Sequence, residues 1–454
     1  MVLGEIAGTG GARTDAAAPL GQRCPHHCRQ GHHDRAPDRL EVPGLDAALR
    51  SGSAQAFVRR GACGLTAFST DMLRHRCGRC GSRVYFDNWS CLACGARLGL
   101  LPDLMHLASL ADAGGGSWRD VSDPAGRRYR PCSNSIDYAI CNGILQEDEV
   151  GTLCRACRFT QQIPSLTVPV HLEYWRRVER AKRRLLFTLA ALRLPLVPRS
   201  ESPEGLGFAF GADIVPGNRF MTSHSDGVIS INIAEADDVE RERMRTGMGE
   251  PCRTLLGHFR HESGHYYLSR LHEVPGATAM VQAIFGDIDS GYAEALASYY
   301  AGNQPFRWTD QYISAYATSH PQEDWAETWA HYLLIVDTLQ SATEAGVNPV
   351  PSPGGLPSSG DRGSTRFETM LARWLPLAEF ANELSRSLGS ADACPFVLTG
   401  PVSAKLSLID SLVDACRARF GSLAGMPPAR QAAPCPDTGS TVNLPLPSTR
   451  SWPS

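Results

Sequence analysis

The stretch HFRHESGHYY (residues 258–267) decides how the rest of this 454-residue chain is interpreted. It holds His261, Glu262 and His265 in the order H-E-x-x-H. On a helix, residues four apart lie on one face, so both imidazoles can reach the same metal ion. Glu262 then lies close to a water on that metal and can accept its proton. The pattern therefore predicts a zinc site on a helix, with Glu262 as the general base that activates a zinc-bound water.

Two histidines leave a catalytic zinc short of a third protein ligand, which must come from another segment. The best source is SAYATSHPQEDWAETWAHYL (residues 314–333), in which Ser319 to Gln322 predicts a capping box at the start of a helix. Glu323 and Glu327 share one face of that helix, and like charges at this spacing repel unless a cation lies near them. We therefore expect Glu323 to bind the metal and Glu327 to orient a ligand histidine through its other ring nitrogen.

The combination of HESGH, Y-x6-E and E-x-x-A-E resembles the metal centre of zincins with a glutamate third ligand, such as anthrax lethal factor. Over about residues 72–420, the chain is similar to bacterial zinc-binding metallopeptidases that carry zinc ribbons before the catalytic domain. The resemblance implies peptide-bond hydrolysis on a zincin-like α+β domain. It also implies that Tyr316 is a phenol that stabilises the oxyanion or protonates the leaving amine. The residue roles that it implies are His261, His265 and Glu323 as ligands and Glu262 as base.

Several residues near these segments are alternative candidates for binding the metal or the substrate. Glu294 follows the motif at a distance that other zincins use for a glutamate ligand, but no flanking tyrosine or second carboxylate supports it. His258 could face the metal, although packing against the same helix is the commoner outcome. His320 and His331 bracket the carboxylates and could bond substrate, but structural roles are favoured for both.

Cysteine spacing indicates a first structural metal site. Its ligands would be Cys77, Cys80, Cys91 and Cys94, in two C-x-x-C-G knuckles. Gly81 and Gly95 follow the knuckles, where a tight turn around a thiolate favours a residue without a Cβ. Residues 81–90 predict a short hairpin between the knuckles. The interpretation is a zinc ribbon, and a rubredoxin-like iron site is the alternative.

A less regular set of cysteines indicates a second structural zinc. It consists of Cys132, Cys141, Cys154 and Cys157, the last two in the knuckle CRAC. Closed four-thiolate sites stabilise small modules and are not catalytic. The expected cofactors are therefore one catalytic zinc and one or two structural zincs.

Composition limits the partners. The chain has 44 Lys and Arg against 47 Asp and Glu, a formal net charge of −3, so no overall field favours nucleic acid. No run of 18 apolar residues predicts a membrane span, and residues 1–30 lack the apolar segment of a signal peptide. Together with the metal-type cysteine spacing, this predicts a cytoplasmic protein whose partner is a peptide or protein substrate.

The sequence divides into the following expected parts: a disordered segment (1–70), zinc ribbon 1 (71–100), ribbon-like module 2 (125–165), the zincin-like domain (166–420) with a flexible insertion (345–365), and a disordered tail (421–454). Helices are expected over residues 171–193, 366–388 and 402–420. In the first, the run RRVERAKRR is interpreted as a solvated face rather than a phosphate site.

In residues 228–234, apolar and polar side chains alternate, which predicts a half-buried strand. Asp226-Gly227 directly before it predicts a turn. By the resemblance, residues 228–234 would be the edge strand that pairs with an extended substrate. The fold class expected is α+β, with a zincin-like metallopeptidase domain preceded by two small zinc-ribbon modules. Two other functions stay open: a catalytically silent zincin-fold binding protein, and a zinc-ribbon regulator associated with nucleic acid.

Overall fold

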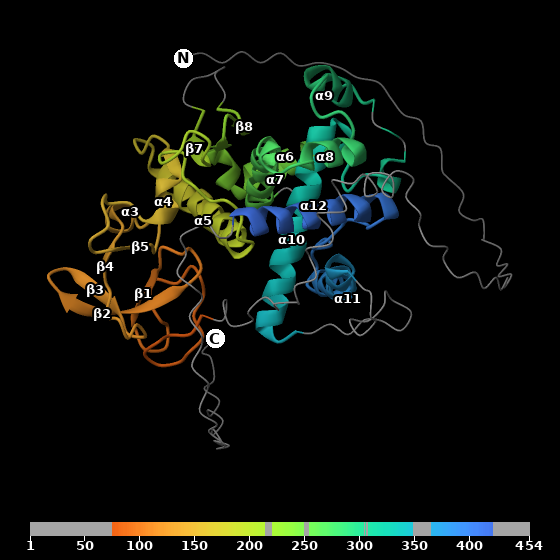
Figure 1. The fold of residues 1–454 in the computed structure, drawn as a ribbon. Helices are drawn as coiled ribbons and strands as arrows, with labels where there is room; N and C mark the ends of the chain where they lie inside the picture. Colours follow the sequence, from red (N-terminus) through yellow and green to blue (C-terminus); the bar gives the residue numbers. More distant parts are fainter. Residues whose placement is uncertain are drawn as a thin grey trace, which may run out of the picture. The chain divides into compact units, whose positions relative to one another are not determined.

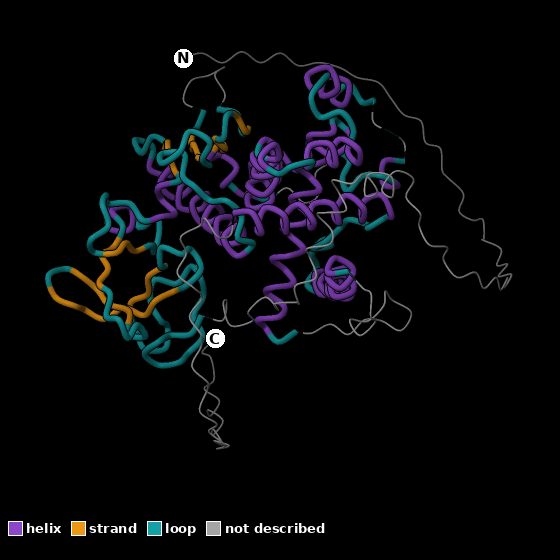
Figure 2. Tube along the Cα trace, in the orientation of Figure 1, coloured by secondary structure: helices purple, strands orange, loops and turns teal. Residues whose placement is uncertain are grey.

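The structure is a computed structural model that describes residues 75–213, 220–248, 254–303, 305, 307–347 and 365–420. The expected disordered ends (1–70 and 421–454) and most of the 345–365 insertion lie outside the described residues. Within the described part the fold is α+β, as expected (Figures 1 and 2). None of the helices described there is long and apolar enough to cross a membrane.

The cysteine-rich region contains one antiparallel sheet with the strand order β1-β2-β3-β4-β5 (Figure 1). Its elements are β1 (Arg97–Leu100), β2 (Leu107–Gly114), β3 (Ser117–Asp120), β4 (Arg128–Pro131) and β5 (Ile144–Gln146), with the short helices α3 (Ser133–Tyr138) and α4 (Arg155–Arg158). The sheet begins just after Cys94 of the first cysteine set and ends with β5, between Cys141 and Cys154 of the second.

The prediction of a hairpin within residues 81–90 is wrong, because the two ends of this segment do not pair with each other. They pair outward instead, Arg83 with Arg76 and Ser90 with Arg97. Each C-x-x-C-G knuckle reverses the chain by itself, so each forms its bridge with the residue on the far side of its own turn.

A second sheet has the strand order β6-β7-β9-β8. Its strands are β6 (Thr160–Gln162), β7 (Gly207–Gly211), β8 (Ser223–Ser225) and β9 (Val228–Asn232). The strand predicted over 228–234 is β9, and the turn at Asp226-Gly227 joins it to β8 as expected. However, β9 lies between β7 and β8, so its assignment as the edge strand is wrong. The two edge strands of the described sheet are β6 and β8, and β8 runs antiparallel to β9.

The remaining secondary-structure elements of the described chain are helices. They are α5 (Pro169–Ala191), α6 (Asp238–Met248), α7 (Leu255–Ser269), α8 (Ala277–Phe285), α9 (Tyr292–Tyr300), α10 (Pro321–Ala345), α11 (Arg366–Ser387) and α12 (Gly400–Phe420), with 3-10 turns η1 (Ile233–Ala236), η2 (Leu271–Glu273), η3 (Trp308–Asp310) and η4 (Tyr316–Thr318). The three helices predicted from periodicity correspond to α5, α11 and α12 within two residues at each end.

The charged run on α5 is not a wholly solvated face, which corrects the expectation. Glu179 and Lys182 are fully buried and form an ion pair at 2.7 Å. The Lys182 ammonium also donates to the carbonyl of Ala156 in the second cysteine knuckle at 2.9 Å. Arg183, also buried, donates to the Asn142 side chain at 2.6 Å. Buried charges need such partners, and here the partners connect α5 to the cysteine-rich region.

The start of α10 also differs from the prediction. Its N-cap is His320, whose Nδ1 accepts the Gln322 backbone N–H at 3.1 Å. Ser319 instead donates to the carbonyl of Tyr316. The reason is Pro321: proline favours the first helical position, which makes the residue before it the cap.

Helices α7 and α10 pack closely, and Gly264 is where they come together. A Cβ at this position would lie 2.9 Å from Ala326 Cα and 3.2 Å from the Trp329 ring. The Trp325 indole donates to the Gly264 carbonyl at 2.9 Å, and the Trp329 indole donates to Ser263 Oγ at 3.0 Å. The glycine of HESGH is therefore required by packing.

We expect Gly264→Ala to lower the free energy of unfolding by about 1–3 kcal/mol, because the added methyl overpacks the contact with α10. In an unconstrained helix the same change would stabilise by about 1 kcal/mol. Denaturant unfolding of both proteins measures the difference, and a more stable alanine variant would contradict the packing argument.

Candidate metal centre and active site

The sequence-predicted ligand set comes together between α7 and α10. His261, His265 and Glu323 bring their ligand atoms within 4.8 Å of one another. His261 Nε2 lies 3.2 Å from His265 Nε2 and 3.0 Å from Glu323 Oε2, and His265 Nε2 lies 3.5 Å from Glu323 Oε1. The i, i+4 spacing on α7 places both imidazoles on the face that meets the first turn of α10.

These distances fit zinc. A tetrahedral ion with bonds of about 2.05 Å separates its ligand atoms by about 3.3 Å, close to the 3.2 Å and 3.0 Å that separate His261 Nε2 from His265 Nε2 and from Glu323 Oε2. Glu323 is 1% exposed, yet its Oε2 accepts no hydrogen bond. A buried carboxylate oxygen without a donor is costly, and a cation between it and the imidazoles would remove that cost.

The electrostatics of His261 also favour a cation at this point. Burial alone would lower its pKa, but the neighbouring carboxylates of Glu323 and Glu327 outweigh burial and raise the pKa well above its usual value. Burial would raise the pKa of Glu327, but its hydrogen bond to His261 lowers it to about 2. Two ionised carboxylates therefore surround one imidazole.

Glu327 takes the position expected of a group that orients a ligand. Its Oε1 lies 2.7 Å from His261 Nδ1, the ring nitrogen opposite the one that faces Glu323. A carboxylate on Nδ1 fixes the ring and leaves Nε2 available for a metal.

The catalytic candidates lie at the same place. Glu262 is buried, with 6% of its surface exposed. It is near enough to Tyr292 that its carboxylate, after burial and Glu323, helps to raise the pKa of the Tyr292 phenol. Tyr316, in η4, has its ring centroid 5.9 Å from that of His261. Tyr292 was not anticipated from the sequence: its hydroxyl donates to Glu323 Oε1 at 2.6 Å.

The alternative residues lie elsewhere or have other partners. Glu294 is exposed on α9 and is not part of the ligand cluster. His258 Nδ1 pairs with Glu235 at 2.5 Å. His320 caps α10, and His331 donates from Nδ1 to the Glu327 carbonyl. The two latter contacts are structural, as expected.

The cysteines gather into the two predicted clusters. They are Cys77, Cys80, Cys91 and Cys94 in the first, and Cys132, Cys141, Cys154 and Cys157 in the second. Sulfur separations are 3.6 Å for two pairs of the first cluster, and 3.4 and 3.8 Å for two pairs of the second. A disulfide would bring two sulfurs to about 2.0 Å, whereas a tetrahedral zinc with bonds of about 2.3 Å separates thiolates by about 3.8 Å. Gly81 and Gly95 have φ values of 73° and 70°, as the knuckle turns require.

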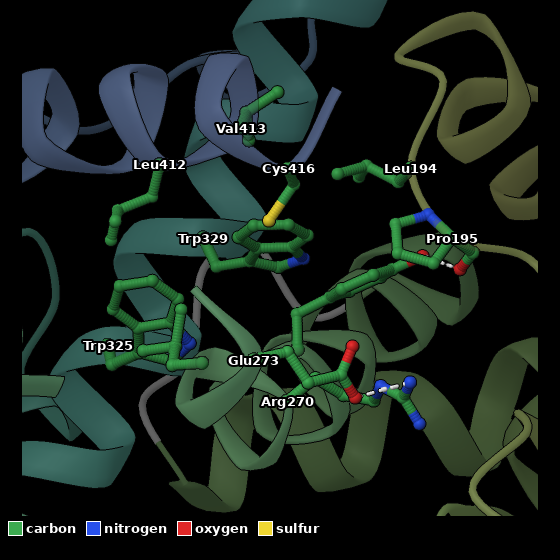
Figure 3. Close-up of a pocket in the computed structure, with 11 residues that line it drawn as sticks. Leu194, Pro195, Arg270, Glu273, Trp325, Trp329, Leu412, Val413 and Cys416 are labelled. Atoms are coloured by element: carbon green, nitrogen blue, oxygen red, sulfur yellow. Dashed lines mark hydrogen bonds and ion pairs between the residues drawn. The ribbon is translucent and has the colours of Figure 1, made fainter. Parts of the chain in front are cut away.

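A small apolar cavity of about 20 Å³ lies behind the α7–α10 contact, next to Trp325, Trp329 and Cys416 (Figure 3). Its volume suits about one water molecule. None of the clustered histidines or carboxylates lines it. The cavity is therefore a gap in packing and not a substrate pocket.

An α+β chain in which two four-cysteine clusters precede an H-E-x-x-H helix and a carboxylate helix has the arrangement of a zincin-type protein with zinc ribbons. The chain belongs to the family described as "putative zinc-binding metallo-peptidase", whose model matches residues 171–412. A zinc-ribbon domain model matches residues 74–168.

Relatives of this chain include uncharacterized proteins from Mycobacterium bovis and from two strains of Mycobacterium tuberculosis. Each is 40% identical over 339 residues, which make up 74% of this chain and 94% of the relative. No solved structure matches the chain significantly.

Purified protein is expected to carry about three zinc ions per chain, one for each ligand cluster. One should exchange readily with a chelator, and two should be held tightly by thiolates. Native mass spectrometry counts them, and a fully loaded chain with a single metal would refute at least one cysteine site.

Glu323→Ala is expected to abolish the exchangeable zinc, because it removes a ligand, while the thiolate-bound zincs remain. Glu327→Ala should weaken that zinc about 10-fold to 100-fold, because only the orienting hydrogen bond is lost. Glu294→Ala is the matched control on an exposed carboxylate. Chelator competition measures each affinity, and loss of the exchangeable zinc in the control instead of in Glu323→Ala would refute the ligand assignment.

Proposed function

We propose that this protein is a zinc-dependent peptidase in which Glu262 activates the attacking water. The observation that supports the proposal most strongly is the cluster of His261, His265 and Glu323, with the buried Glu262 next to His261 on α7. Zinc, when bound there, would acidify a water and polarise the scissile carbonyl.

Glu262 would accept the proton of the attacking water as the water adds to the peptide carbonyl. The same carboxyl would then donate that proton to the departing amine nitrogen as the C–N bond breaks. One carboxylate can serve both steps because it returns to its ionised form at the end. A scaffold that only bound peptides would have no use for this base.

Tyr316 would contribute from η4, with its ring near that of His261. Its place in η4, directly before α10, brings the phenol close to the ligand cluster. A phenol can donate a hydrogen bond to the oxygen on which negative charge develops in the transition state.

The edge strand β8 offers a place for the substrate backbone. Ser225 and Val228 flank a two-residue turn and form a hydrogen-bonded pair, so the next pair, His224 and Ile229, is of the non-hydrogen-bonded type. The backbone groups of His224 therefore point away from β9, toward a strand that could add at this edge. The His224 ring stacks over His265 with 6.5 Å between centroids, so an added peptide would pass the metal ligands.

Glu262→Gln is expected to keep the zinc content of the wild type and to lower peptide hydrolysis by several orders of magnitude, because the amide cannot act as a base. Tyr316→Phe should also keep zinc but lower turnover less. Glu294→Gln, an exposed carboxylate on α9, serves as control. The rate of peptide-library cleavage is measured for the wild type and the three variants. A Glu262→Gln variant as active as the wild type would contradict the mechanism.

A further inference from the structure

The two oxygens of Glu323 have different surroundings. Oε2 is buried, accepts no hydrogen bond and lies 3.0 Å from His261 Nε2. Oε1 accepts the hydroxyl of Tyr292 at 2.6 Å and lies farther from the imidazoles, 3.5 Å from His265 Nε2. A carboxylate can bind zinc through one oxygen or two, and the second bond would occupy the position that a catalytic zinc keeps open.

We propose that Tyr292 is a positioning residue of the metal centre: it holds Glu323 Oε1 so that Glu323 binds zinc through Oε2 alone. This inference rests on the metal centre of the proposed function and assigns a role to a residue outside the H-E-x-x-H motif and the carboxylate helix. A strong hydrogen bond to one carboxylate oxygen fixes the rotation of the carboxylate and thereby the oxygen that faces the metal.

The position of Tyr292 is itself fixed with respect to α10. Its ring packs edge-on against the His320 ring, with centroids 5.0 Å apart. His320 Nε2 donates to the carbonyl of Ser290, and the Gln322 side chain donates to the carbonyl of Ile288 at 2.6 Å. The segment before α9 is thus attached to the first turn of α10, the turn that carries Glu323.

The Tyr292 hydroxyl is the donor in this contact, because a carboxylate oxygen can only accept. Tyr292 is 39% exposed, so it lies at the boundary between the ligand cluster and solvent.

The test compares Tyr292→Phe and Tyr292→Ala with the control Tyr300→Phe, which removes a hydroxyl from the exposed end of the same helix. Phenylalanine keeps the ring on His320 and removes only the donor. Both Tyr292 variants are expected to weaken the exchangeable zinc about 10-fold to 100-fold, while the thiolate-bound zincs and the control stay at wild-type values. Chelator competition on the full-length protein measures the affinity.

Cobalt substitution provides a second readout. If Glu323 becomes bidentate without Tyr292, the visible absorption of the cobalt form should lose intensity, as it does when a four-coordinate site becomes five-coordinate. Wild-type affinity and spectrum in Tyr292→Phe, with loss only in Tyr292→Ala, would refute the inference and assign Tyr292 a packing role.

These outcomes separate the inference from the proposed function. A wild type that binds zinc and cleaves peptides, with an unchanged Tyr292→Phe variant, refutes only the role of Tyr292. A wild type that cleaves no peptide, but whose zinc affinity and cobalt spectrum change in Tyr292→Phe, refutes only the peptidase proposal.

Discussion

The contact between one imidazole and two carboxylates is the interaction on which the site depends. His261 on α7 meets Glu323 through one ring nitrogen and Glu327 through the other. The two carboxylates are four residues apart on α10, so the imidazole spans one turn of the neighbouring helix. This requires the helices to approach closely, and Gly264, one turn beyond His261, permits that approach.

Other buried carboxylates of α10 have permanent cations as partners, which sets Glu323 and Glu327 apart. Asp324 pairs with Lys405 of α12 at 2.6 Å, and Asp337 pairs with Arg260 of α7 at 2.6 Å. Those pairs hold the helices together without a ligand. Glu323 and Glu327 instead face imidazoles, which carry charge only when protonated or coordinated to a metal. The positive charge opposite these two carboxylates is therefore either a proton on His261 or a metal ion bound in its place.

The parts of the site that the sequence predicted follow from local geometry. The i, i+4 spacing on a helix sufficed to bring His261 to His265, and the same spacing placed Glu323 and Glu327 on one face. Tyr292 could not be found in this way, because it comes from a separate helix and no spacing rule relates it to Glu323. The alternation of apolar and polar residues likewise predicted a strand at 228–234. This pattern does not indicate which strands will lie on either side of it in the sheet.

The second cysteine cluster is linked to the metal centre by a continuous series of contacts. Lys182 holds the Ala156 carbonyl within that knuckle, and its ammonium lies 5.9 Å from the Phe208 ring centroid. Phe208 packs against Phe259, with centroids 5.7 Å apart, and Phe259 precedes His261 by two residues on α7. Lys182 needs acceptors because its ammonium is buried, and the Ala156 carbonyl is one of them. Phe259 lies on the same helix as His261 and His265, so these contacts connect the second cysteine knuckle to the helix that carries the two histidines.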